Sequence, residues 1–186
     1  TQNDWHQIIG VPKALGWSTQ LRNEPALALT YERKWRISRE IAGLGVDIIP
    51  ALGATVGNVL TYGSAVATVR FGHNLGGDYG QARIRPALSG TEWFVCDAAC
   101  KDGLGWYVFV GVEGRLVGRN VFLDGSSFAS SRSVQKKNAV ADISGGVSVF
   151  WSSRVRLDLS LTRRTKEFVG QTKQDKFAMI GLSFGL

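Results

Sequence analysis

The chain has 186 residues, which suits a single domain, and its net charge of +7 favours an anionic partner such as a phosphorylated ligand or an acidic membrane surface. Hydrophobic residues make up 44% of the sequence while the mean hydropathy is close to zero, so apolar and polar residues must alternate. The longest apolar run, Trp106 to Val110, is far shorter than the roughly 18 residues of a transmembrane helix, which excludes helical spanning. Basic residues form no continuous block, so no nucleic-acid partner is expected.

The N-terminal residues predict a short helix followed by a loop. Between Asp4 and Gly16 the apolar residues recur at loosely helical spacing, and Pro12 interrupts them. We therefore expect a helix over about residues 3–10. Because no signal peptide is visible at Thr1, we expect a mature chain or a piece of a longer one.

From Pro25 the apolar period changes to two, which predicts a strand. One face carries Leu27, Leu29, Tyr31, Arg33, Trp35 and Ile37, and the other carries Ala28, Thr30, Glu32, Lys34 and Arg36. A tight turn at residues 42–45 leads to two further expected strands, at about 46–57 and 59–72. Residues 72–104 then fit neither a strand nor a short turn.

Four later segments repeat the alternation, at residues 106–119, 141–151, 155–164 and 178–186. In the clearest of them, Val155, Leu157, Leu159 and Leu161 alternate with Arg156, Asp158, Ser160 and Thr162. Ser152-Ser153 is a tight connection, whereas residues 122–137 and 167–176 predict long loops. This gives about seven strands.

Strands with one apolar face and one face rich in charge, Gly and Ser are typical of an outer-membrane barrel, whose outside meets lipid and whose interior is polar. A soluble β-barrel or sandwich can show the same alternation. The membrane is favoured by aromatic residues at strand ends, by a chain that stops on a strand, and by opposite charges on the polar faces, Glu32 with Lys34 and Arg36, Glu113 with Arg115, and Asp158 with Arg156. The aromatic residues in question are Trp35, Trp106, Phe122, Trp151, Phe168, Phe177 and Phe184.

The predicted fold is therefore all-β, an antiparallel up-and-down transmembrane β-barrel with a short N-terminal loop helix. An odd number of strands cannot close an ordinary bacterial barrel, so an upstream part with an odd number of strands is implied. The chain is expected to close a barrel only together with that part.

The two cysteines, Cys96 and Cys100, lie four residues apart. A metal site would need further ligands, and only Asp97 and Asp102 are near in sequence. We therefore expect a small-loop disulfide, formed in an oxidising compartment.

Several ordered motifs resemble those of the LpxR-type lipid A 3′-O-deacylases. They are His6-Gln7-Ile8-Ile9-Gly10, Gly16-Trp17-Ser18-Thr19-Gln20-Leu21, Asn23-Glu24-Pro25, Tyr31-Glu32-Arg33-Lys34-Trp35, Gly53-Ala54-Thr55-Val56-Gly57-Asn58-Val59, Arg70-Phe71-Gly72 and Gly111-Val112-Glu113-Gly114-Arg115. None is a general catalytic signature, and the resemblance depends on their occurrence in this order.

The resemblance implies that the chain is the C-terminal two-thirds of a twelve-stranded barrel in the outer membrane of a Gram-negative bacterium, monomeric at full length. Residues 1–24 would form a helix-bearing extracellular loop, and residues 25–186 the strands and loops of the same single domain. The implied activity is calcium-dependent removal of the 3′-acyloxyacyl group from lipid A, the lipid part of lipopolysaccharide. The Ca²⁺ ligands are expected upstream of Thr1. A non-enzymatic barrel, acting as a small channel or scaffold, is the alternative function.

By the same resemblance, His6 matches the catalytic histidine. An imidazole with a pKa near 6.5 can take a proton from water at neutral pH. Without the resemblance a lone His beside Trp5 would more often be structural, and with it catalysis is favoured. The loop serines have no His or carboxylate at triad-like spacing, so we expect activated water rather than a serine nucleophile. Four loop cations could hold lipid A phosphates or could simply be solvated: Arg132, Lys136, Lys137 and Lys173.

Overall fold

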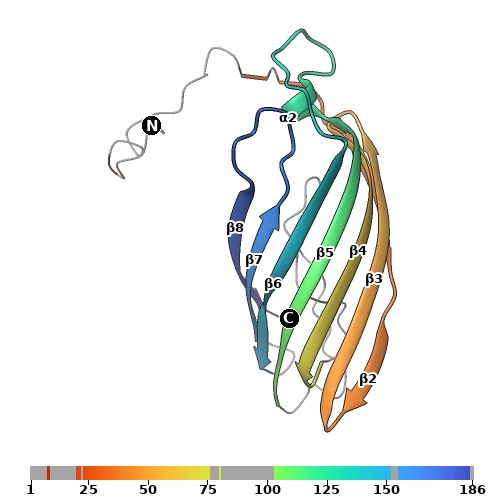
Figure 1. The fold of residues 1–186 in the computed structure, drawn as a ribbon, viewed down its shortest axis with the longest axis vertical. Coiled ribbons are helices and arrows are strands. Elements are labelled where there is room, and N and C mark those ends of the chain that lie inside the picture. Colours follow the sequence, from red (N-terminus) through yellow and green to blue (C-terminus); the bar gives the residue numbers. More distant parts are fainter. Residues whose placement is uncertain are drawn as a thin grey trace.

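The computed structural model describes residues 8, 20–21, 23–75, 80, 103–151 and 155–184. These residues form eight strands and one short helix (Figure 1). The elements are β1 (Ala28–Lys34), β2 (Ile37–Ile41), β3 (Leu44–Gly57), β4 (Leu60–His73), β5 (Leu104–Asn120), α2 (Val121–Asp124), β6 (Ala139–Trp151), β7 (Val155–Arg164) and β8 (Asp175–Phe184). In this part of the chain, no helix is long and apolar enough to cross a membrane.

The strands form one antiparallel sheet in the order β1-β3-β4-β5-β6-β7-β8, with β2 also paired to β3. The sheet curves, so that it has a concave face and an outer face, and it is open (Figure 1). The connections containing α2 and residues 165–174 lie at one end, which we call the loop end. The β2–β3 turn and the end of β4 lie at the other, which we call the turn end.

The eight strands occupy seven rows of the sheet, because β1 and β2 pair with successive parts of β3. The backbone N–H of Trp35 donates to the carbonyl oxygen of Pro50 at 3.0 Å. Pro50 has no N–H with which to return the bond, so the ladder is interrupted at this pair. The single first strand expected from the sequence is therefore two strands, in one unbroken register.

The alternation of exposed and buried side chains confirms the strand faces predicted from the sequence. On β7, Leu159 is 40% exposed whereas its neighbour Asp158 is 3% exposed. The same alternation holds along β5, where Val110 and Val112 are exposed and Glu113 is buried. The outer face is therefore the apolar one, and the charged residues of these strands lie on the concave face, as a transmembrane barrel requires.

An aromatic row lies on the outer face near the turn end. It consists of Phe71, Trp106, Trp151 and Phe184, from four different strands. The rings of Phe71 and Trp106 meet edge to face, with centroids 6.5 Å apart. The prediction that Phe177 also faces the membrane interface is wrong. Phe177 alternates with the exposed Ala178, so its side chain is on the concave side, where it lies half-buried under the guanidinium of Arg164.

The segment after β4 begins by turning into the concave face. Leu75 is buried there with Tyr107, Phe109 and Phe150. Gly45 makes room for it, because a Cβ at residue 45 would lie 2.6 Å from Leu75 Cδ1. The start of the segment that the sequence left unexplained thus packs inside the curve of the sheet rather than forming a turn below it.

Two expectations lie outside the described residues. The N-terminal helix is described only at Ile8, which is helical, and the Cys96–Cys100 disulfide falls wholly outside. The short helix α2 was not predicted. Asn120 accepts a hydrogen bond from the N–H of Phe122 at 3.1 Å, while Asp124 accepts one from the N–H of Asn120 at 2.8 Å. This reciprocal capping is a local signal that the sequence does contain.

If the outer face of β7 meets lipid, Leu159→Arg in the full-length parent should destabilise the barrel by about 2–4 kcal/mol, because a cation near the middle of the bilayer is poorly solvated. Ser160→Asn on the concave face should cost much less. Urea unfolding of the two variants in lipid vesicles gives the comparison. Equal costs would show that the register is shifted by one residue.

Candidate functional site

The two long connections at the loop end are paired to each other. Lys136 and Phe168 form an isolated antiparallel bridge. The N–H of Lys137 donates to the carbonyl of Glu167 at 2.7 Å, and that of Val169 donates to the carbonyl of Gln135 at 2.8 Å. These bonds extend the β6–β7 ladder beyond the strands, so the loops form a structured rim.

The segment before β1 is anchored to this rim by one carboxylate. Glu24 accepts hydrogen bonds from the backbone N–H groups of Ser127 at 2.8 Å and Phe128 at 3.1 Å. The bond from Ser127 is the main cause that holds the pKa of Glu24 below its ordinary value, against the opposing effect of desolvation. Glu24 therefore ties the end of the N-terminal segment to the β5–β6 connection.

A second tie runs through the β3–β4 turn. Asn58 accepts from the N–H of Leu27 at 2.8 Å and donates its amide to the carbonyl of Pro25 at 2.7 Å. Arg119 in turn donates to the carbonyl of Asn58 at 2.8 Å and to the hydroxyl of Ser127 at 2.8 Å. These bonds fix where the N-terminal segment joins β1.

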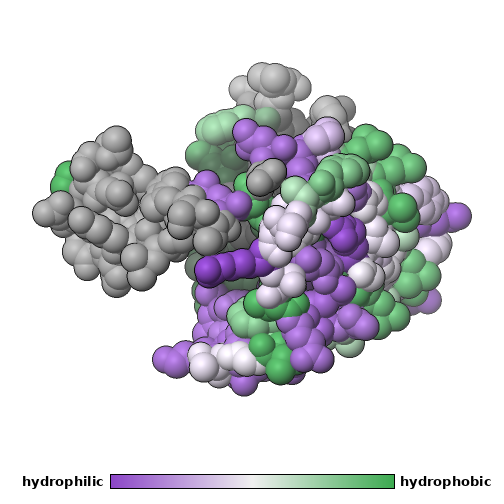
Figure 2. Space-filling model, turned by 90° about the horizontal axis from the view of Figure 1, so that it is seen from above, coloured by the Kyte–Doolittle hydropathy of each residue, from purple (hydrophilic) through white to green (hydrophobic). Residues whose placement is uncertain are grey.

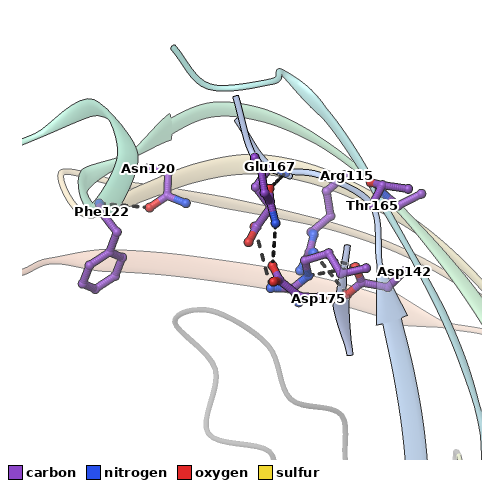
Figure 3. Close-up of polar contacts among 10 residues, drawn as sticks. Arg115, Asn120, Phe122, Asp142, Thr165, Glu167 and Asp175 are labelled. Atoms are coloured by element: carbon purple, nitrogen blue, oxygen red, sulfur yellow. Dashed lines mark hydrogen bonds and ion pairs between the residues drawn. The ribbon is translucent and has the colours of Figure 1, made fainter. Parts of the chain in front are cut away.

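Beneath the rim, two arginines on the concave face share one aspartate (Figure 3). Arg115 of β5 donates to both oxygens of Asp142 on β6 at 3.1 Å, and Arg164 of β7 donates to the same carboxylate at 2.9 Å. Arg164 connects this group to the loop, since it also contacts Glu167 at 3.7 Å. Gln171 in turn accepts from the N–H of Glu167 and donates to Asp175 of β8. The cluster links three strands to the rim.

Nearer the turn end, a second polar cluster surrounds Tyr107. Arg70 lies 5.0 Å from the centre of its ring and donates to Asp47 at 2.7 Å. Arg156 donates to the Tyr107 hydroxyl at 2.6 Å and to Asp158 at 2.9 Å. These five side chains are almost completely buried. They form a continuous belt of paired charge across the concave face, from β3 to β7.

The predicted charge pairs are present for Glu32 with Lys34, at 3.5 Å, and for Asp158 with Arg156. The sequence missed two partners that lie on other strands. Arg36 also contacts Asp47 at 3.1 Å, and Arg115 contacts Asp142.

The predicted site residues have different surroundings. His6 lies outside the described residues. Lys136 is half-buried and donates to Asp124 at 2.7 Å; burial alone would raise the pKa of that carboxyl, but hydrogen bonds from Lys136 and Asn120 hold it below its ordinary value. Arg132, Lys137 and Lys173 are exposed on the two long connections. Three of the four candidate cations are thus accessible at the loop end.

No group of three or more His, Cys, Asp or Glu side chains is placed to hold a metal ion within the ranges that the structure describes. The second histidine, His73, ends β4 at the turn end, away from the rim. It therefore lies apart from the candidate cations.

The model of a family described as "Outer membrane protein LpxR" matches residues 1–186. A solved structure described as LpxR from Salmonella typhimurium is similar, with 28% sequence identity and a TM-score of 0.71. The match covers 96% of this chain and 58% of that one, so the chain spans little more than half of the solved relative. The search of curated proteins finds no match.

If Glu24 anchors the N-terminal segment, Glu24→Gln in the full-length parent should speed amide hydrogen exchange at Ser127 and Phe128, because a neutral amide oxygen is a weaker acceptor than a carboxylate. Glu40→Gln is the matched control, since Glu40 is exposed on β2 and the described residues offer it no partner. Unchanged exchange in Glu24→Gln would contradict the anchor.

The same anchor should depend on pH. Because the pKa of Glu24 is lowered in the folded protein, its contribution is complete above the ordinary value of 4.5 and is lost as the pH falls through the lowered one. The amide resonance of Ser127, followed by NMR from pH 7 downward, should shift with a midpoint below 4.5. A midpoint at or above that value would contradict the assignment.

Proposed function

Because the chain belongs to the LpxR family of outer membrane proteins, we propose that, within its full-length parent, it hydrolyses the ester-linked 3′-acyloxyacyl group of lipid A. The family model matches the whole chain, which is the observation that carries this proposal. The chain is an outer-membrane protein of a Gram-negative bacterium, so lipid A is within its reach.

The arrangement of the loop end supports this function. The N-terminal segment, on which His6 lies in sequence, is tied to the rim through Glu24 and Asn58. The same rim carries the exposed cations Lys137 and Lys173, whose charge complements lipid A phosphates. The catalytic segment and the phosphate-binding groups would then act at the same side of the membrane.

His6 would act as the general base. Its imidazole takes a proton from a water molecule while the water oxygen attacks the ester carbonyl carbon. The bond between that carbon and the sugar oxygen then breaks, and the proton returns from His6 to the departing alkoxide. The products are a free fatty acid and a lipid A with a free 3′-hydroxyl.

Calcium enters the proposal through the family resemblance alone. A bound Ca²⁺ would polarise the ester carbonyl and stabilise its negative charge. Among the described residues, no group of His, Cys, Asp or Glu side chains fits this ion. Its oxygen ligands are expected from residues upstream of Thr1.

The alternative, a small channel, finds less support in the concave face. Tyr107 is 0% exposed and Phe150 is 2% exposed, and paired charges surround them. Side chains therefore fill this level of the curve rather than lining a water-filled path. A non-enzymatic scaffold remains the competing function, and lipid A analysis separates it from the enzyme.

His6→Ala in the full-length parent should insert normally and reduce deacylation by at least about 10²-fold, as removal of a general base does. His73→Ala is the control, because this histidine lies at the turn end and should be dispensable. Mass spectrometry of lipid A from expressing cells measures the lost acyloxyacyl group. Full activity in an inserted His6→Ala protein would refute the role of His6, and intact lipid A with the wild-type parent would refute the enzyme itself.

Chelation should test calcium independently of the histidine. Treating the purified full-length parent with EGTA should abolish release of fatty acid from lipid A, and added Ca²⁺ should restore it, because the developing oxyanion would lose its counter-ion. A chelated enzyme that keeps its rate would exclude the ion from the mechanism.

A further inference from the structure

A large groove lies on the outer face of the sheet, close to the loop end. Its volume is about 860 Å³, within the range of about 300–1,000 Å³ that is usual for small-molecule sites. The strand residues that line it from the outer face are small, apart from a leucine on β3 and one on β5: Leu52, Gly63, Ala65, Gly114, Leu116, Ala139 and Ala141. Since these positions alternate with the buried ones, the groove opens toward lipid rather than into the concave side.

The groove is deep because glycines on the outer face have no side chain to fill it. A Cβ added to Gly63 or Gly114 would meet no atom within 4 Å. The two glycines flank Leu116 in the sheet, because Leu116 pairs with Gly63 and follows Gly114 by two residues. Three consecutive strands, β4 to β6, therefore present glycine or alanine where a barrel wall could carry larger apolar residues.

A second depression adjoins the first. It has a volume of about 590 Å³ and is centred on Gly145, which pairs with Val110 on one side and Leu161 on the other. Its wall is almost wholly apolar, and Arg163 and Lys176 lie at its loop-end side. Two adjacent apolar depressions suit a ligand with several acyl chains better than a ligand with one.

The depth in the membrane also fits. Ala65 lies six residues along β4 from Phe71 of the aromatic row, and Gly63 eight, so these positions are about 20 and 27 Å from that row along the strand. Strands of such barrels tilt by about 35–45°, so these positions lie roughly 15 and 20 Å above the row, within the loop-end half of an apolar band that is about 25 Å tall. Figure 2, viewed from the loop end, shows green apolar patches along the outer margin and purple side chains gathered over much of the end.

Cations without partners stand where the groove meets the rim. Lys137 and Lys166 line it, and among the described residues neither side chain has a hydrogen-bond or ion-pair partner. Beside the second depression, Lys176 also has no hydrogen-bond or ion-pair partner among the described residues, whereas Arg163 donates to Gln174 at 2.5 Å. Phosphate groups at the interface would neutralise these charges, each worth about fivefold in affinity.

From this arrangement we infer that the outer wall of β3–β8 binds one phosphorylated, multiply acylated lipid of the outer leaflet, with acyl chains in the two depressions and a phosphate on Lys137 and Lys166. The site is built only from strand and rim residues. It does not depend on hydrolysis, and it would persist if the parent proved to be a scaffold.

The test uses the full-length parent carrying His6→Ala, so that turnover cannot consume the probe. Native mass spectrometry measures the affinity for bisphosphorylated lipid A. Gly114→Trp, which fills the groove without a backbone clash, should weaken binding at least tenfold, and Lys137→Ala and Lys166→Ala about fivefold each. Ile48→Trp is the matched control, because Ile48 is exposed on the outer face of β3 and lines neither depression.

Insertion of each variant is checked by its heat-modifiable migration. Gly63→Trp fills the same groove from the neighbouring strand and replaces Gly114→Trp if that variant fails to insert. Phosphatidylglycerol, which is anionic but has a single phosphate and two chains, should not displace lipid A. Wild-type affinity in an inserted groove-filling variant, equal loss in Ile48→Trp, or equal competition by phosphatidylglycerol would each overturn the proposal.

Discussion

Paired charge on the concave face is the interaction on which the rest of this sheet depends. Asp47 and Arg70 are each 1% exposed, and a buried carboxylate or guanidinium that lost its partner would cost several kcal/mol. Tyr107 holds the arrangement together, because its ring lies between Arg70 and Arg156 while its hydroxyl accepts from the latter. Nonpolar replacements could in principle be more stable, so the belt is better understood as a device for specificity than as a source of stability.

That specificity acts on register. A slip of one residue between β6 and β7 would turn Arg156 and Asp158 toward the apolar outer face and bring Leu157 and Leu159 inward. Both changes are unfavourable at once, so the belt and the lipid face select the same pairing. Once the concave face has fixed the register, the outer face needs only to be apolar. Its side chains are then free to vary in size, and glycine and alanine can hollow a groove without loss of pairing.

The strand faces could be predicted because alternation is local: β7 was expected at residues 155–164 and is found there. The interruption between β1 and β2 could be predicted only with the strand register, because it arises where Pro50, which has no N–H, pairs with Trp35. Ion pairs between different strands could not be predicted, because partners such as Arg115 and Asp142 are 27 residues apart in the sequence. The anchor between Glu24 and Ser127 spans 103 residues, and no local pattern marks it. The groove was missed for the same reason, since its small residues become neighbours only through the registers of β4, β5 and β6.

The anchor and the groove meet in one structure, the β5–β6 connection. In this connection, Ser127 and Phe128 donate to Glu24 and so hold the N-terminal segment. Lys137, ten residues after Ser127, lines the groove. Because the bridge between Lys136 and Phe168 fixes the connection to the neighbouring loop, a displacement at one contact is resisted at the other. The two proposals therefore share Lys137 as a phosphate-binding group, while the anchor through Glu24 and the apolar wall of the groove depend on different residues of the same connection and sheet.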